Sequence, residues 1–212
     1  MSGINGFFGH SQHVRFGIEV IMQRLGVFGG AFNPPHMGHV RLARDFADRL
    51  SLAKVTVVPS FIPPHKSAEG LASGGDRLEM CRLAFCEDER FAVSSMEIDR
   101  GGKSYTYDTL TEIIKQNPGA ELFLIIGSDM FLTFDTWYRY EDILKICTLC
   151  TAARENNITL QNNKIDAIIS DLPALELCST DIREMQRNGG DISVFTGEKV
   201  AKYISDRGLY RD

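Results

Sequence analysis

A phosphate-binding turn is the first chemistry that the residue types predict, in the run Gly-Gly-Ala-Phe-Asn-Pro-Pro-His-Met-Gly-His at positions 29–39. The run follows a β-rich stretch and opens an amphipathic one. Its glycines can therefore bring backbone N–H groups close to an anion at a helix N-terminus. Pro34 and Pro35 stiffen the turn. His36 and His39 are three residues apart, so they share one face at the helix start and can reach the same ligand.

Two other interpretations of this run are weaker. A lone His-x-x-His pair is usually incidental to a Gly/Pro turn, and it could also be half of a zinc site. No Cys, His or carboxylate with matching spacing completes such a site. The run also lacks the Lys-Ser/Thr of a P-loop and the G-x-G-x-x-G of dinucleotide folds. We therefore interpret it as a phosphate site of another kind.

The elements that must position this turn alternate along the chain. In the helix that follows it, Val40, Ala43, Ala47 and Leu50 form an apolar face. The alternation predicts an α/β fold, with a Rossmann-like, mainly parallel sheet and helices on both faces. Ligands bind such sheets beyond the carboxyl ends of the strands, where the turn would lie. We predict strands at Arg24–Phe28, Lys54–Pro59, Phe91–Met96, Glu121–Ile126, Ile146–Ala153 and Ile165–Ser170, and helices at Gly38–Leu50, Asp76–Cys86, Thr106–Gln116, Tyr140–Lys145, Thr180–Asn188 and Gly197–Arg207.

The length of 212 residues suits one domain, which we expect at residues 23–212. Residues 1–22 precede the first predicted strand without a clear pattern, so we expect an N-terminal extension there. Met22 stands directly before that strand. A native extension and a misassigned start both remain open interpretations of residues 1–21.

Charge and composition narrow the function classes. A net charge of -5 argues against a broad nucleic-acid footprint, which needs clustered basic residues. No apolar run approaches the roughly 18 residues of a membrane span. The five cysteines predict reduced thiols in a cytoplasmic protein, with Cys147 and Cys150 as core thiols on opposite faces of one strand. The sequence favours neither a monomer nor a homo-oligomer.

The run at positions 29–39 resembles the G-x-F-D-P-x-H-x-G-H signature of the adenylyltransferase and cytidylyltransferase superfamily. The second signature of that superfamily, S-x-T-x-x-R, is approximated near the C-terminus by Ser179-Thr180-Asp181-Ile182-Arg183 after Cys178. The two motifs stand in the family's order, with most of the predicted sheet between them. The resemblance implies the nucleotidyltransferase fold.

Further segments are similar to the bacterial nicotinate mononucleotide adenylyltransferases. They are Ile62-Pro63-Pro64-His65-Lys66, Ser104-Tyr105-Thr106-Tyr107-Asp108-Thr109-Leu110, Gly127-Ser128-Asp129 with the later Trp137, and Ala153-Arg154. This resemblance covers nearly everything from Arg24 to Tyr210. It implies adenylyl transfer from ATP to nicotinate mononucleotide in NAD biosynthesis. Nicotinamide mononucleotide or phosphopantetheine as acceptor, and a non-catalytic nucleotide-binding module, remain as alternatives.

The chemistry suits these residues, because an acceptor phosphate is already ionised and needs no general base. The resemblance implies catalytic roles for His36, His39, Lys66 and Arg183. It implies ATP contacts from Gly29, Gly30, Phe32, Gly38, Gly127, Asp129, Ser179, Thr180 and Arg183. It implies contacts to nicotinate mononucleotide from Asn33, Tyr105, Thr106, Trp137 and Arg154. No residue is expected to ligate a metal, since Mg²⁺ would arrive on ATP.

Two positions depart from the family pattern. Asn33 stands where the signature has Asp, which keeps much of the turn's hydrogen bonding but removes a negative charge beside the phosphates. Cys178 stands where Ser is common, a change that we expect to affect packing more than chemistry. We expect an active enzyme in spite of both.

Overall fold

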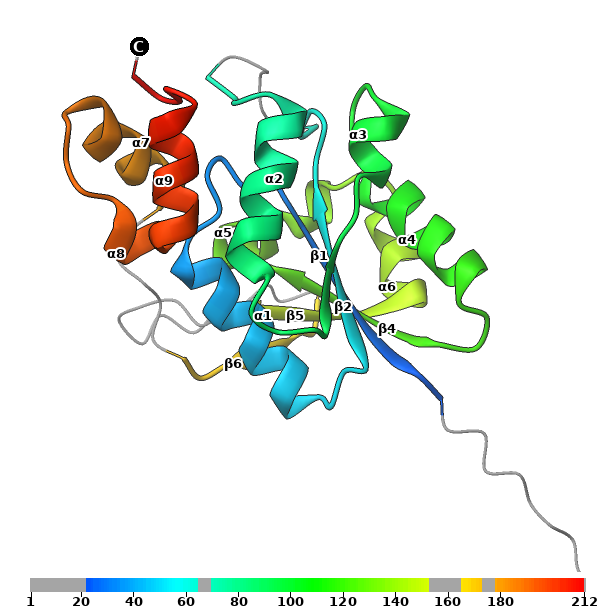
Figure 1. Cartoon of the computed structure of the whole chain (residues 1–212). Helices are drawn as coiled ribbons and strands as arrows, with labels where there is room; N and C mark the ends of the chain where they lie inside the picture. The colour runs from blue at the N-terminus through cyan, green and yellow to red at the C-terminus, as the bar shows by residue number, and fades with distance from the viewer. Residues whose placement is uncertain (1–21, 65–69, 153–164, 173–177, 212) are drawn as a thin grey trace, which may run out of the picture.

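A six-stranded parallel sheet forms the centre of the computed structural model, which describes residues 22–64, 70–152, 165–172 and 178–211. The strand order is β3-β2-β1-β4-β5-β6, and every neighbouring pair is parallel. The predicted α/β architecture is confirmed (Figure 1). The strands are β1 (Arg24–Gly30), β2 (Lys54–Pro59), β3 (Phe91–Val93), β4 (Glu121–Ile126), β5 (Cys147–Ala152) and β6 (Ile168–Ser170).

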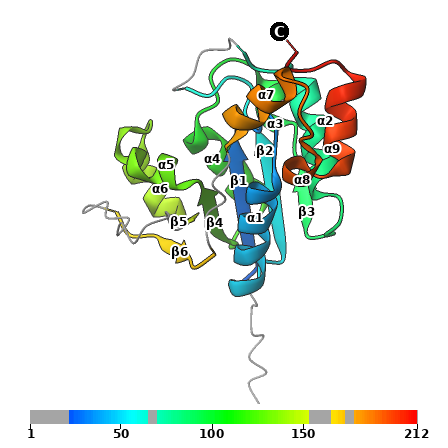
Figure 2. The same cartoon turned by 90° about the vertical axis from the view of Figure 1, so that its left-hand side faces the viewer.

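Helices cover both faces of the sheet. One apolar cluster joins α1 and α2 to one face, and a second joins α4 and α6 to the other. The C-terminal helices pack beside α2 around Met80, Ile182 and Ile204 (Figure 2). The helices are α1 (Met37–Arg49), α2 (Gly74–Phe85), α3 (Met96–Arg100), α4 (Thr106–Gln116), α5 (Ser128–Leu132), the 3₁₀ turn η1 (Phe134–Thr136), α6 (Tyr140–Ile146), α7 (Ser179–Arg187), α8 (Ser193–Thr196) and α9 (Glu198–Asp206).

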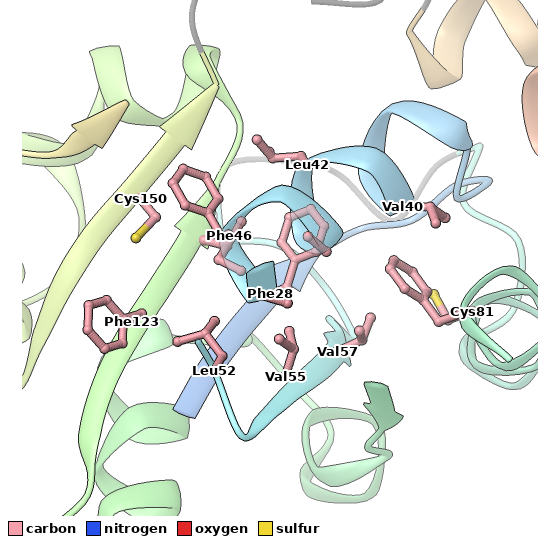
Figure 3. Packing of buried hydrophobic residues seen from close by; sticks show 14 of the residues in the cluster. Phe28, Val40, Leu42, Phe46, Leu52, Val55, Val57, Cys81, Phe123 and Cys150 are labelled. Atoms are coloured by element: carbon pink, nitrogen blue, oxygen red, sulfur yellow. The ribbon is translucent and has the colours of Figure 1, made fainter. Parts of the chain in front are cut away.

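The packing of α1 on the sheet fixes where the predicted phosphate-binding turn ends. Val40, Ala43 and Ala47 are buried as expected, and Leu42 and Phe46 are buried with them. Leu50 is only half-buried, because the helix ends at Arg49. Figure 3 shows α1 pressed on the sheet through Phe46 and its neighbours. The buried stripe is wide because α1 contacts both the sheet and α2.

Two predicted strands, Phe91–Met96 and Ile165–Ser170, are each three residues too long. Strand β3 ends at Val93, and Met96 begins α3, a helix that was not predicted. The Ser94 side chain accepts the Met96 N–H and turns the chain away from the sheet. The predicted strand at Ile165–Ser170 pairs with β5 only from Ile168. Helices α5 and α8 were also missed, because segments of four or five residues carry too little periodicity.

Two further expectations concern the cysteines and the membrane. Cys147 and Cys150 are buried free thiols in the clusters on opposite faces of the sheet, as expected. Among the described residues, no helix has the length and apolar character that crossing a membrane requires.

Since all strands are parallel, their carboxyl ends share one edge of the sheet, and the turns after β1 and β4 meet there.

Candidate active site

A cavity of about 770 Å³ lies at this edge of the sheet. Lys66 and Arg154 fall outside the described residues. Tyr105 is not among the lining residues, although its neighbour Thr106 is. The structure brings the other predicted site residues together in the cavity wall: Gly29, Gly30, Phe32, Asn33, His36, Gly38, His39, Thr106, Gly127, Asp129, Trp137, Ser179, Thr180 and Arg183.

The turn after β1 is shaped by Phe32, whose backbone has a φ of 47°. A non-glycine residue in this left-handed region is strained, so the surrounding packing must hold it. The Phe32 ring is buried, with its centroid 5.3 Å from that of Phe28 and 5.1 Å from that of His39. A Cβ at Gly30 would lie 3.2 Å from this ring, which explains the glycine at that position.

The two motif histidines form one unit at the start of α1. His36 is the N-cap residue, and its N–H donates to Nδ1 of His39 at 3.1 Å. Their ring centroids are 3.8 Å apart. Because Nδ1 accepts, a neutral His39 carries its proton on Nε2. Burial lowers the pKa of His36 to about 4, so this imidazole is neutral at pH 7 and acts as a hydrogen-bonding group.

The C-terminal motif docks directly on the turn. Nη1 of Arg183 donates to the carbonyl oxygen of Asn33 at 2.8 Å and to that of Ser179 at 3.1 Å, while Nη2 lies 3.2 Å from the Thr180 hydroxyl. The Ser179 hydroxyl donates to the carbonyl oxygen of Pro34 at 2.9 Å. The N-terminus of α7 therefore faces the cavity beside the two histidines, with the N–H groups that a helix start leaves unpaired.

The Asn33 side chain is 5% exposed and bonds mainly to protein. Its amide nitrogen donates to the Gly70 carbonyl at 2.9 Å, and its oxygen accepts from the Ala72 N–H at 2.9 Å and the Tyr210 hydroxyl at 2.8 Å. These bonds leave one amide hydrogen for any ligand. The contact between Asn33 and nicotinate mononucleotide stays a prediction. Tyr210 was missed as a site residue, since no local pattern marks it.

The far end of the cavity is formed by the start of α4 and by Trp137. Tyr105 caps α4, and Thr106 begins it, so the first amides of the helix have no intrahelical acceptor. The Trp137 ring packs at 4.9 Å from Phe134. Its buried Nε1 has no hydrogen-bond partner among the described residues. This end offers an aromatic face beside a helix N-terminus, an arrangement suited to a planar anionic ring.

A buried carboxylate at this end was not predicted. Glu97 on α3 lines the cavity, is 5% exposed, and accepts from the Thr109 hydroxyl at 2.5 Å. Burial raises the pKa of Glu97, and hydrogen bonds from Thr109 and Ser104 oppose that rise. Its only sequence signal is an acidic residue between the apolar Met96 and Ile98.

The segment that follows β4 also contributes to the cavity wall. Gly127 caps α5, and Asp129 lies in its first turn. Both residues are exposed and line the cavity. The described residues hold no group of three or more His, Cys, Asp or Glu side chains with the geometry of a metal site. The wall thus offers donors for anions at one end and an aromatic face at the other.

Comparison with known proteins agrees with the family resemblance found in the sequence. The cytidylyltransferase-like family model matches residues 27–185. A probable nicotinate-nucleotide adenylyltransferase of Geobacillus kaustophilus is 35% identical over 189 residues, which cover 89% of this chain and 87% of that protein. The Listeria monocytogenes (strain F2365) protein of the same description is 36% identical over 187 residues, covering 88% of this chain and 97% of that protein.

Solved structures support the fold. A putative nicotinate-nucleotide adenylyltransferase from Vibrio parahaemolyticus has a TM-score of 0.68 at 24% identity, covering 90% of this chain and 97% of that one. Plasmodium falciparum nicotinic acid mononucleotide adenylyltransferase complexed with NaAD has a TM-score of 0.75 at 17% identity, with 89% and 97% covered. At these identities the likeness concerns the fold alone.

Proposed function

The chain belongs to the cytidylyltransferase-like family, and we propose that it is a nicotinate-nucleotide adenylyltransferase. The reaction joins ATP and nicotinate mononucleotide to give nicotinate adenine dinucleotide and pyrophosphate, a step of NAD biosynthesis. The observation that carries the proposal is that one cavity, formed by the described residues, has donors for phosphates at one end and an aromatic face beside a helix start at the other. Two anionic substrates could meet in it end to end.

The chemical step is an in-line displacement. A phosphate oxygen of the mononucleotide attacks the α-phosphorus of ATP. The new P–O bond forms as the bond from the α-phosphorus to the bridging oxygen breaks, and that electron pair leaves with pyrophosphate. The attacking phosphate is ionised near neutral pH, so no residue need act as a general base. Catalysis consists of aligning the reactants and stabilising charge on the phosphoryl oxygens.

At the phosphate end we assign this work to His36, His39 and Arg183. Nε2 of His39 is a donor, and an anion beside His36 would favour its protonated form, which adds positive charge where negative charge develops. Arg183, the Thr180 hydroxyl and the Ser179 backbone N–H at the start of α7 are assigned to the β- and γ-phosphates, because the single hydroxyl hydrogen of Ser179 is donated to Pro34. The assignment of Lys66 to the phosphates rests on the family pattern. The turn residues Gly29, Gly30, Phe32 and Gly38 would frame the triphosphate.

At the other end the amides of Tyr105 and Thr106 are assigned to the nicotinate carboxylate, since a helix start favours an anion. Trp137 would pack against the pyridine ring. Gly127 and Asp129 would contact the ATP ribose. The assignment of Arg154 to the mononucleotide phosphate again rests on the family pattern.

The proposal also covers the metal ion, the domain organisation and the cellular location. We propose that Mg²⁺ enters as part of the MgATP substrate, held by phosphate oxygens and water. Residues 23–212 are proposed as one domain, with residues 1–22 as an extension. A cytoplasmic location is proposed on the residue pattern alone.

Pyrophosphate release from ATP, measured with three acceptors, tests the function. We expect kcat/KM for nicotinate mononucleotide to exceed that for nicotinamide mononucleotide by more than about tenfold, because helix-terminal amides bind a carboxylate better than a carboxamide. Equal values would contradict the nicotinate preference, and a higher value with phosphopantetheine would reassign the acceptor. Turnover by none of the three would favour a non-catalytic module. His39→Ala should reduce turnover by about 100-fold.

A further inference from the structure

Arg77 is a buried cation that lies behind the cavity wall. It is 1% exposed and stands in the first turns of α2, which begins at Gly74. It does not line the cavity. Burial lowers the pKa of Arg77, and no carboxylate of the described residues forms an ion pair with it. Its neighbour Asp76 bonds instead to Ser73, Tyr203 and Arg207.

Such a position is unfavourable for a cation on two grounds. A charge removed from water without an opposite charge beside it carries a large desolvation cost. A positive side chain near a helix N-terminus also opposes the helix dipole. An arginine that breaks local rules in this way points to a role outside helix stability.

The guanidinium is held by four main-chain carbonyl oxygens. It donates to Ala31 at 2.9 Å, Ser60 at 2.5 Å, Phe61 at 2.9 Å and Ala72 at 3.0 Å. These acceptors belong to three segments: the turn after β1, the end of β2 and the approach to α2. Only a planar group with donors on several sides can join three segments in this way, which is a property of arginine and not of lysine.

The bond to Ala31 has a consequence for the cavity. In a trans peptide the carbonyl oxygen and the following N–H point in opposite directions. Because the Ala31 oxygen points to Arg77, the Phe32 N–H points away from it. Phe32 lines the cavity, and its N–H donates to no acceptor among the described residues. The strained φ of 47° at Phe32 means that this peptide plane needs an external support.

We propose that Arg77 is a positioning residue, which holds the Ala31–Phe32 peptide so that the Phe32 N–H donates to a phosphate of the bound nucleotide. This inference rests on the proposed function. Arg77 touches no substrate and acts through the backbone. Its bonds to Ser60, Phe61 and Ala72 hold the same peptide against two further segments of the cavity wall.

The first test compares Arg77→Lys, Arg77→Met and the matched control Arg82→Met. The control alters an exposed arginine of the same helix, whose one ion-pair partner among the described residues is Glu79. Arg77→Lys retains the charge but cannot span the four carbonyls. We expect kcat per folded site to fall by about 100-fold, since a misplaced donor costs that much. KM for nicotinate mononucleotide should change by less than about threefold. Arg82→Met should retain wild-type kcat.

Chemical rescue separates positioning from folding. In Arg77→Ala, guanidinium ion at millimolar concentration should restore part of kcat, whereas methylammonium should not. A purely structural role would lower the yield of folded protein and leave kcat per folded site unchanged. Wild-type kcat per folded site in Arg77→Lys or Arg77→Met would overturn the proposal.

A measurement on the unaltered protein tests the predicted bond from the Phe32 N–H to a phosphate, without which the proposal fails, even where variants fail to fold. Amide hydrogen exchange at Phe32 is followed with and without α,β-methylene ATP. We expect the analogue to slow exchange at Phe32, because the N–H then donates to a phosphate. Unchanged exchange at Phe32 in the bound protein would overturn the proposal. This readout needs no acceptor substrate, so it stays separate from failure of the proposed transfer to nicotinate mononucleotide.

Discussion

The guanidinium of Arg183 donates to the carbonyl oxygen of Asn33 at 2.8 Å, although the two residues are 150 positions apart. The bond ties α7 to the turn that follows β1. The Ser179 hydroxyl makes a second tie to the same turn through Pro34. The two motifs therefore form one structural unit, and a change in either should alter the position of the other.

Arg183→Lys should lower kcat/KM for ATP by about 100-fold, because the compact ammonium group of lysine cannot span the Asn33 and Ser179 carbonyls and a phosphate at the same time. KM for nicotinate mononucleotide should change little. Steady-state kinetics with each substrate varied in turn checks this. Arg187→Ala, at the exposed end of the same helix, is the control and should retain activity. An Arg183→Lys enzyme with wild-type kcat/KM would contradict the assignment.

Asn33→Asp should alter the rate by less than about tenfold. A carboxylate can accept from the Ala72 N–H and the Tyr210 hydroxyl, but it cannot donate to the Gly70 carbonyl. The free energy of unfolding should fall by about 1–3 kcal/mol. Urea unfolding and turnover, measured on the same preparations, check both statements. An inactive wild type that this substitution activates would refute the expectation.

Tyr210→Phe should destabilise the protein by about 1 kcal/mol, because the buried Asn33 oxygen loses one of its two donors. The effects of Tyr210→Phe and Asn33→Ala should not add, since each change removes the hydrogen bond that the two residues share. A double-mutant cycle in urea measures the coupling. Exposed Tyr138 offers a matched Tyr→Phe control. Strict additivity would mean that the bond contributes nothing.

Lowering the pH should reduce the free energy of unfolding, because His36 becomes protonated in the unfolded chain. Its folded pKa is about 4, below the usual 6.5, so the unfolded chain binds more protons between these values. Stability is thus lost as pH falls from 6.5 toward 4, by roughly 2 kcal/mol between pH 7.5 and pH 5. The comparison is the unfolding free energy of wild type and His36→Gln at both pH values. An equal loss in the variant would show that other groups cause it.

Trp137→Ala should raise KM for nicotinate mononucleotide by about tenfold or more, given the usual strength of aromatic stacking. KM for ATP should stay near the wild-type value. Trp137→Phe retains an aromatic face against Phe134 and should show a smaller effect. An equal rise in both KM values would indicate general loss of structure and not loss of a ring contact.

The sequence alone determined the α/β architecture, the two motifs and their place at the strand ends. These follow from local signals: hydrophobic periodicity, helix starts, and the glycines and prolines of one turn. The strand and helix of the first βα unit were predicted to within two residues at each end. Where the local signal is short, as at the end of β3 and at α3, the prediction failed because pairing at the sheet edge decides the outcome.

Only the tertiary structure decided how the turn is held in place. The Asn33 side chain is held by Tyr210, 177 positions away, and the Ala31 carbonyl by Arg77, 46 positions away. Neither partner carries a pattern that marks it, because a hydrogen bond depends on where two segments meet in space and not on the residues beside each partner. In the sequence alone, nothing distinguishes Arg77 from an ordinary arginine on a helix. Its burial, four carbonyl partners and place behind the cavity arise only when β1, β2 and α2 pack together.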